Sequence, residues 1–182
     1  MQAYSLQIQT VINIELLMSS GKRVFSFIMA VAIGLAGLYV YKKYKVAPDL
    51  PIMQMDLFDE TGQKTNLQSK KGKPMIVSYY ASWCGDCRKE MKELASIKDT
   101  ALAGVEIICI TDESVEKLIS FKTNHDYSYT YYRINKRFFE IDIYSIPVTY
   151  FINSKGEMVY NKVGAIRWKD ASFIQYAKKQ LQ

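Results

Sequence analysis

The sequence has few cysteines and no internal repeat, and each shortage excludes a class of protein. Three cysteines among 182 residues are too few for a disulfide-stapled scaffold, and the odd number leaves at least one of them unpaired. The lack of repeats and low-complexity tracts excludes solenoids and long disordered segments. Because 49% of the residues are apolar, the chain can bury a core, and its length allows one domain with an appendage.

Acidic residues are scarce near the start of the chain, so the excess of positive charge lies there. Residues 1–45 hold five cations and one acid, Glu15, whereas the remaining residues hold 19 cations and 17 acids. A nucleic-acid-binding protein carries a basic stripe on its globular part. The nearly balanced remainder therefore predicts no nucleic-acid partner, and the early cations are typical of the flanks of a membrane segment.

Residues 24–41 form an uncharged apolar run. As a helix this run would be about 27 Å long, close to the hydrocarbon thickness of a bilayer. Tyr39, Tyr41 and the cations on both flanks suit the two membrane interfaces. We predict an uncleaved transmembrane anchor at residues 24–41. The alternatives are a cleaved signal peptide and a buried core helix, which would normally keep a polar stripe.

The anchor divides the chain into four expected parts. Residues 1–23 form a leader whose first 17 residues have no basic character, which leads us to hypothesise that Met18 is the natural start. Residues 24–41 are the anchor, residues 42–50 a linker, and residues 51–182 the globular domain. The cations on both sides of the anchor leave its orientation in the membrane open.

The globular part alternates between expected strands and helices. Apolar runs and turn residues predict strands at residues 54–58, 64–67, 75–80, 105–111, 148–152 and 157–161. Helical spacing predicts helices at residues 87–97, 113–124 and 168–181. The tyrosines at positions 127, 129, 131 and 132 alternate as in an edge strand. This order predicts an α/β fold in which helices flank a central mixed β-sheet on both faces.

Cys84 and Cys87 follow the expected strand at residues 75–80 and begin the next helix. A cysteine at a helix N-terminus has a stabilised thiolate, because free backbone amides and the helix dipole favour negative charge there. We expect Cys84 to be the exposed nucleophile, and Cys87, one turn further and more buried, to attack the mixed disulfide. The pair is thus expected to be a redox-active disulfide.

A zinc site is the other reading of this spacing. Zinc needs two further ligands, and the chain offers only Cys109 and His125, at no recognisable spacing. We therefore predict no metal. Cys109 lies in an expected buried strand, where an inert apolar role is favoured, and His125 lies at an expected helix end on the surface.

Residues 79–91 read Tyr-Tyr-Ala-Ser-Trp-Cys-Gly-Asp-Cys-Arg-Lys-Glu-Met. This segment resembles the active site of thioredoxin-like proteins, especially the membrane-anchored TlpA/ResA-type thiol-disulfide oxidoreductases. Further matches lie at residues 47–49, 71–73 and 145–149, and the resemblance covers residues 46–180. It implies a thioredoxin-like fold and a cis bond between Ile146 and Pro147. It also implies that Ile146 pairs with an extended substrate segment and that Trp83 forms part of the docking surface.

The sequence departs from the thioredoxin pattern at three positions. Ser78 replaces the buried acid that lies six residues before the first cysteine, so Asp86 and Glu90 become the candidates for proton transfer. Lys92 replaces the helix-kinking proline. Asp86 replaces the usual proline or histidine between the cysteines, and its charge should raise the pKa of Cys84 and favour a reducing pair.

The leading hypothesis is an anchored reductase of disulfides in extracytoplasmic proteins. No nucleotide or flavin motif is present and no cofactor is expected, so the electrons must come from a membrane or thiol donor. The resemblance implies cytochrome c maturation as one such activity. A disulfide oxidase or isomerase is the alternative enzyme. A copper metallochaperone that uses the two thiolates and His125 is the alternative of another class.

Overall fold

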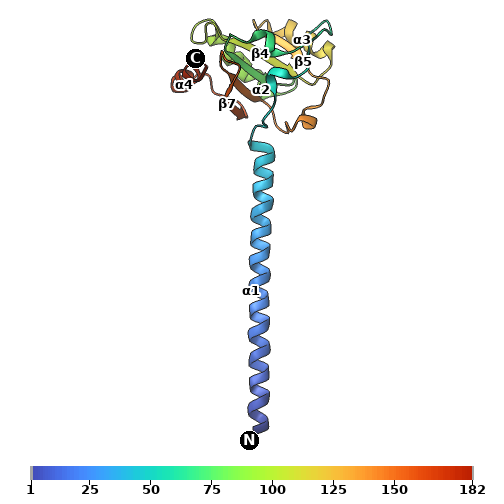
Figure 1. The fold of residues 1–182 in the computed structure, drawn as a ribbon, viewed down its shortest axis with the longest axis vertical. Coiled ribbons are helices and arrows are strands. Elements are labelled where there is room, and N and C mark those ends of the chain that lie inside the picture. Colours follow the sequence, from blue (N-terminus) through green and yellow to red (C-terminus); the bar gives the residue numbers. More distant parts are fainter. Residues whose placement is uncertain (1, 182) are drawn as a thin grey trace. The chain divides into compact units, whose positions relative to one another are not determined.

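The computed structural model describes the backbone of residues 2–181 and the side chains of residues 24–181. The chain divides into two compact units, Met1–Lys42 and Lys43–Gln182. Helix α1 spans Gln2–Lys45, and Figure 1 draws it in blue to cyan. Within it, the segment Val24–Lys45 contains an 18-residue window with a mean hydropathy of 2.1, and none of that window is buried. By length and composition this segment could cross a membrane.

Helix α1 extends beyond the predicted anchor in both directions. The described part of the expected leader is helical, and so are the first residues of the expected linker. The continuous helix marks neither the boundary between residues 23 and 24 nor the one between residues 41 and 42. The four-part division of the chain and the start at Met18 therefore remain predictions.

The second unit holds one sheet and several helices (Figure 1). The strands are β1 (Leu57–Phe58), β2 (Lys64–Thr65), β3 (Met75–Tyr79), β4 (Glu106–Thr111), β5 (Thr130–Arg133), β6 (Val148–Ile152) and β7 (Met158–Val163). The α-helices are α2 (Gly85–Lys98), α3 (Val115–His125) and α4 (Ala171–Leu181). Short 3-10 helices are η1 (Ile52–Gln54), η2 (Leu67–Lys70) and η3 (Phe138–Ile141).

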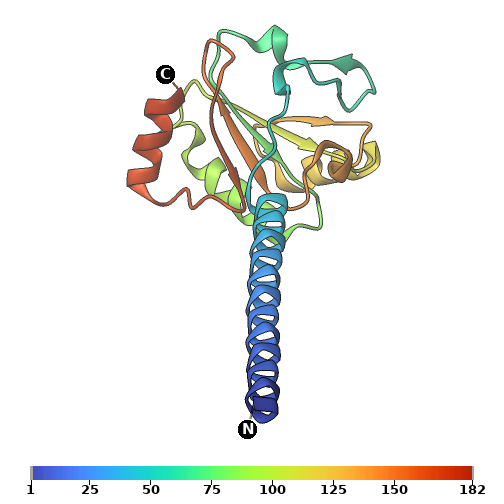
Figure 2. The same cartoon turned by 60° about the horizontal axis from the view of Figure 1, so that its bottom comes forward.

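The strands are ordered β2-β1-β5-β4-β3-β6-β7, with β2 and β7 at the edges (Figure 2). Strands β3, β4 and β5 are parallel to one another. Strand β6 is antiparallel to β3, and β7 is antiparallel to β6, so β7 runs in the same direction as β3. The mixed sheet was predicted. The edge position of the tyrosine-rich strand was wrong, because Phe58 of β1 pairs with Arg133 and covers the outer side of β5.

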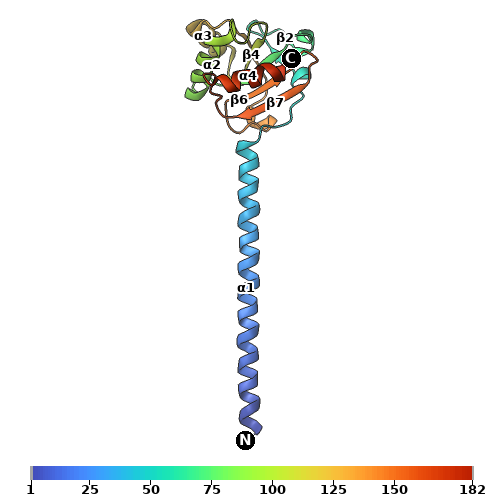
Figure 3. The same cartoon turned by 90° about the vertical axis from the view of Figure 1, so that its left-hand side faces the viewer.

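The helices are unevenly divided between the faces of the sheet. The steps from β3 to β4 and from β4 to β5 run in one direction across the sheet, and right-handed crossovers therefore put α2 and α3 on the same face. Helix α4 joins them and packs against β6 and β7 (Figure 3). The opposite face is covered by η1, η2 and η3, through Ile52, Leu67 and Phe138.

The start of each α-helix differs from its prediction, and α3 begins at Val115 rather than at residue 113. Helix α2 begins at Gly85 because Cys84 is its N-cap, and its side chain accepts a hydrogen bond from the backbone N–H of Cys87. Helix α4 begins at Ala171 rather than at residue 168. Trp168 lies before it and is fully buried in the core on the helical face, packed near Phe151 and Phe173.

Candidate active site

Cys84 and Cys87 lie where the chain leaves β3 and enters α2. Their side chains form a disulfide with an S–S distance of 2.05 Å and Cα atoms 5.3 Å apart. The backbone N–H of Cys87 donates a hydrogen bond of 3.1 Å to Sγ of Cys84. Sγ of Cys84 therefore lies at the helix N-terminus, where the free amides favour negative charge.

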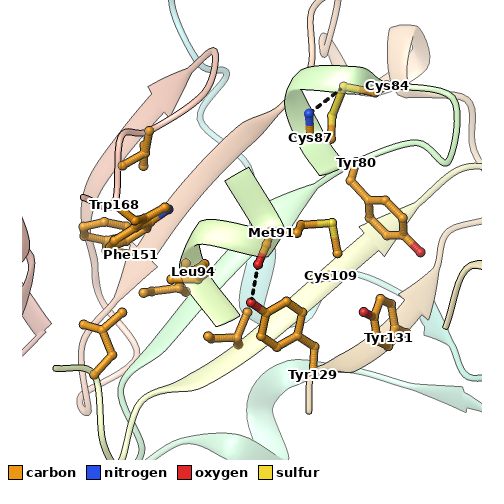
Figure 4. Close-up of a cluster of buried hydrophobic side chains, with 14 of the residues drawn as sticks. Tyr80, Cys84, Cys87, Met91, Leu94, Cys109, Tyr129, Tyr131, Phe151 and Trp168 are labelled. Carbon is orange, nitrogen blue, oxygen red and sulfur yellow. Dashed lines mark hydrogen bonds between the residues drawn. A yellow bond between two sulfur atoms is a disulfide. The ribbon is translucent and has the colours of Figure 1, made fainter. Parts of the chain in front are cut away.

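Both cysteines are more buried than their neighbour Trp83. Cys84 is 6% exposed and Cys87 is 1% exposed, whereas Trp83 is 70% exposed. The prediction of an exposed Cys84 was wrong in degree, because this residue packs into the core cluster with Tyr80 and Met91 (Figure 4). Cys84 nevertheless lines an open groove and Cys87 does not, so Cys84 is the more accessible of the two.

A groove of about 880 Å³ opens beside Cys84. It is lined by the start of α2, the chain after β4, and the connection from β5 to β6: Trp83, Cys84, Gly85, Asp86, Asp112, Glu113, Ser114, Lys117, Arg137, Phe138, Phe139, Ile143, Tyr144, Ser145 and Ile146. Nε of Arg137 lies 3.3 Å from Oδ2 of Asp112. Nζ of Lys117 lies 3.3 Å from Oε1 of Glu113. Asp86 is exposed and pairs with none of the residues that the structure describes. Most of the charge in the groove is thus internally paired.

The connection that enters β6 brings Ile146 and Pro147 to this groove. The Ile146–Pro147 bond is cis, as the resemblance implied. Pro147 is buried, and its carbonyl accepts a hydrogen bond of 2.8 Å from the N–H of Gly164. Ile146 lines the groove, and its backbone N–H and C=O make no hydrogen bond within the described chain. An unpaired backbone edge therefore lies in the same groove as Cys84.

Glu113 fixes the loop that precedes Cys84. Its Oε2 accepts a hydrogen bond of 2.5 Å from the backbone N–H of Ser82, and its Oε1 accepts one of 2.9 Å from the Ser82 hydroxyl. Arg88 of α2 donates a 2.7 Å hydrogen bond to the Ser82 carbonyl. No sequence pattern singles out Glu113, apart from its position just after a strand that ends near the cysteines.

Glu90 is a buried acid on α2, three residues after Cys87 and 2% exposed. Its Oε1 accepts a 3.0 Å hydrogen bond from the Thr149 hydroxyl, and its Oε2 accepts one of 3.0 Å from the N–H of Ile166. Burial raises the pKa of Glu90 to about 7, and these two hydrogen bonds oppose the rise. The indole N–H of Trp168 is near enough to lower this pKa too, although it makes no hydrogen bond of ordinary geometry.

A known family matches most of the globular unit. The model of the AhpC/TSA family matches residues 45–161, which is more than half of the chain. The chain belongs to the AhpC/TSA family.

Relatives within this thioredoxin-like family carry names that describe disulfide chemistry. The chain is 24% identical over 159 residues to the thioredoxin-like protein YneN of Bacillus subtilis, and the match covers 79% of this chain and 90% of YneN. It is 28% identical over 133 residues to the thiol-disulfide oxidoreductase ResA of Oceanobacillus iheyensis, covering 70% of this chain and 68% of ResA. The chain is therefore a thiol-disulfide oxidoreductase of the ResA/DsbE type.

Solved structures support the same fold. One is a putative thiol:disulfide interchange protein DsbE from Chlorobium tepidum, with a TM-score of 0.61 and 18% identity, covering 75% of this chain and all of that one (100%). Another is a putative protein disulfide isomerase from Bacteroides thetaiotaomicron, with a TM-score of 0.59 and 24% identity, covering 75% of this chain and 92% of that one. The thioredoxin-like fold was thus predicted correctly.

In this member of the AhpC/TSA family, the two acids near the cysteines have different environments. Ser78, at the position of the missing buried acid, pairs across the sheet with Thr149, the residue that binds Glu90. Glu90 therefore brings a buried carboxylate from α2 toward this part of the sheet. Asp86 lies in the groove and is exposed. Lys92, further along α2, is also exposed but does not line the groove.

Cys109 and His125 lie apart from the groove. Cys109 is fully buried in β4, and burial raises its pKa well above the usual thiol range. The half-buried ring of His125 stacks on Phe121 at 4.1 Å, and its Nδ1 lies 2.9 Å from the Phe121 carbonyl oxygen. Neither residue lines the groove beside Cys84. In the described part of the chain, no three His, Cys, Asp or Glu side chains are grouped as metal ligands.

Proposed function

We propose that this protein is a membrane-anchored reductase of disulfides in extracytoplasmic proteins. The observation that carries the proposal is the Cys84–Cys87 disulfide at the N-terminus of α2, in a groove that also contains the unpaired backbone of Ile146. The sulfur of Cys84, the unpaired backbone of Ile146 and the exposed ring of Trp83 all lie in this groove. Together they suit an extended polypeptide that presents a disulfide.

The reaction begins from the reduced pair. The thiolate of Cys84 attacks one sulfur of the substrate disulfide, which forms a mixed disulfide and releases the other substrate sulfur as a thiolate. Cys87 then loses its proton and attacks Sγ of Cys84, which forms the Cys84–Cys87 disulfide and releases the second substrate thiolate. Two electrons pass to the substrate, whose thiolates take up two protons. A membrane or thiol donor must return two electrons and two protons to the protein.

Glu90 is our candidate for the group that accepts the proton of Cys87. Both residues are buried and lie three positions apart on α2, so they share one side of the helix. A pKa of about 7 lets a carboxyl group both take and give a proton near neutral pH. Asp86 is exposed and suits an electrostatic role instead.

Asp86 favours the reducing direction. A carboxylate beside Cys84 disfavours the thiolate, and a less stable reduced form makes a weaker oxidant. We expect a reduction potential below about −200 mV. A value near −120 mV, which is typical of a strong oxidant, would instead support the oxidase or isomerase alternative.

The apolar segment Val24–Lys45 is the proposed anchor, and the globular unit would then work at a membrane. Apoproteins of cytochromes c are one class of substrate that fits the proposal, because haem attachment needs their cysteines reduced. The copper metallochaperone is less favoured, since His125 is engaged with Phe121 and lies outside the groove.

A Cys87→Ser trap tests the proposal most directly. With Cys87 removed, the mixed disulfide on Cys84 cannot be resolved, so the natural substrate should remain covalently bound. The matched variant Cys84→Ser should trap nothing and should lose the reduction of insulin disulfides. Failure of the Cys87→Ser chain to retain any protein by disulfide in cells would contradict a protein substrate.

A further inference from the structure

Phe139 is held at the groove by its neighbour in η3. Phe138 is only 9% exposed and packs against Tyr79 at 5.8 Å between ring centroids, while its N–H donates a 3.1 Å hydrogen bond to Asp112. The next residue, Phe139, is 60% exposed and lines the groove. Because Phe138 fixes the backbone, the exposed ring of Phe139 is presented in a defined place, which lowers the entropy cost of binding through it.

Exposed apolar side chains of the globular unit gather at this groove. Among its described residues, the large ones are Tyr44, Val46, Trp83, Ile119, Phe139, Tyr144 and Tyr176. Three of the seven, Trp83, Phe139 and Tyr144, line the groove beside Cys84. Single exposed apolar residues are ordinary, but a group of aromatic rings around one reactive sulfur marks an interaction surface.

The charges of the groove favour recognition through apolar contact. Asp112 and Glu113 are paired with Arg137 and Lys117, so these groups offer little net charge to a partner. The unpaired backbone of Ile146 suits an extended segment better than a folded second copy or a small molecule. The occupant is therefore an extended segment whose apolar side chains meet the aromatic rings.

We propose that Phe139, together with Trp83, selects substrate segments that carry a bulky apolar side chain beside the reacting cysteine. This inference rests on the proposed function, because it names the substrate class of the same groove. The ring of Phe139 would cover the apolar side chain while the substrate sulfur approaches Cys84.

Two peptides that differ only beside their cysteine test this selection. Each peptide has one cysteine and is used as its disulfide-linked dimer, with Phe on both sides of the cysteine in one and Ser in the other. The pre-reduced full chain in lipid nanodiscs is mixed with each dimer, and the second-order rate constant of its oxidation is followed by thiol labelling. The wild-type chain should prefer the Phe peptide by about tenfold, and Phe139→Ser should bring the ratio to within about twofold.

Two further variants separate recognition from general damage. Phe139→Leu, which keeps an apolar side chain, should retain most of the preference. Tyr176→Ser removes an aromatic ring that is 41% exposed but lies outside the groove, and it should leave the ratio unchanged. A wild-type ratio near one, or a ratio that Phe139→Ser does not alter, would overturn the inference. A wild-type chain that reduces neither peptide would overturn the proposed function itself and the inference with it.

Discussion

The hydroxyl of Thr149 donates a hydrogen bond of 3.0 Å to Oε1 of Glu90. Thr149 lies on β6, two residues after Pro147, and Glu90 lies on α2, three residues after Cys87. This contact therefore links the strand that leaves the groove to the helix that carries the redox pair. Because burial raises the pKa of Glu90 to about 7 and this hydrogen bond lowers it, Thr149 helps to set the pH at which Glu90 ionises.

Thr149→Val should raise the pKa of Glu90. The variant keeps the shape of the side chain but removes a hydrogen bond to the charged carboxylate, so the pKa should rise by about one unit. The pH dependence of the step in which Cys87 resolves a mixed disulfide would report this change. Thr149→Ser, which restores the hydroxyl, should return the profile to that of the wild type. Identical profiles for the Val variant and the wild type would show that this hydroxyl does not tune Glu90.

Glu90→Gln should remove a pH dependence of stability. The pKa of Glu90 is about 7 in the folded chain, above the ordinary glutamate value of 4.5, so the folded chain holds this proton more tightly than the unfolded chain. Wild-type stability should therefore fall as pH rises from about 4.5 to about 7, by roughly 3 kcal/mol, and then level off.

Chemical denaturation of the oxidised chain at pH 5 and pH 8 measures this effect. The difference between the two pH values should shrink in Glu90→Gln, whereas Glu93→Gln, on the same helix, should keep it. The Gln variant should also resolve mixed disulfides more slowly. An undiminished pH dependence in Glu90→Gln would argue against a raised pKa at this position.

Asp86→Asn should make the pair more oxidising. Removal of the unpaired carboxylate near Cys84 stabilises its thiolate and so the reduced form. An exposed charge interaction of this kind shifts the potential by about 10 to 20 mV. Equilibration with glutathione buffers measures the potential, and Asp56→Asn, at an exposed acid outside the groove, provides the control. A shift to a more negative potential would contradict the reducing role of Asp86.

Glu113→Ala should loosen the loop before Cys84. The change removes two hydrogen bonds to Ser82 and should destabilise the fold by roughly 1 to 3 kcal/mol. Hydrogen exchange at the Ser82 amide should become faster. Glu116→Ala, at an exposed acid in the first turn of α3, should leave that amide protected. If the Ser82 amide exchanges equally slowly in both variants, Glu113 does not hold the loop.

Local patterns in the sequence were enough to predict several features. The cysteine spacing at a strand–helix junction, the buried strands and the mixed sheet all follow from residues that are neighbours along the chain. The cis bond at Pro147 was predicted through the family resemblance, and the structure contains it. The apolar run at residues 24–41 is equally local, since its lack of charge depends on no partner.

Other features depend on residues that meet only in the folded chain. The sequence made Asp86 and Glu90 equal candidates, and burial against Thr149 and Ile166 distinguishes them. Strand β5 is an interior strand because it pairs with β1, which has only two residues. So short a strand has no periodicity from which its partner could be predicted.

By itself, then, the sequence determined the redox pair, its place between a strand and a helix, and the class of fold, because each depends on short-range spacing. The tertiary structure decided which acid is buried, how Glu113 holds the loop, and that Phe139 faces the groove of Cys84. These depend on the order of the strands and on which side chains lose contact with water. Such long-range packing sets burial, and burial in turn sets the pKa of Glu90.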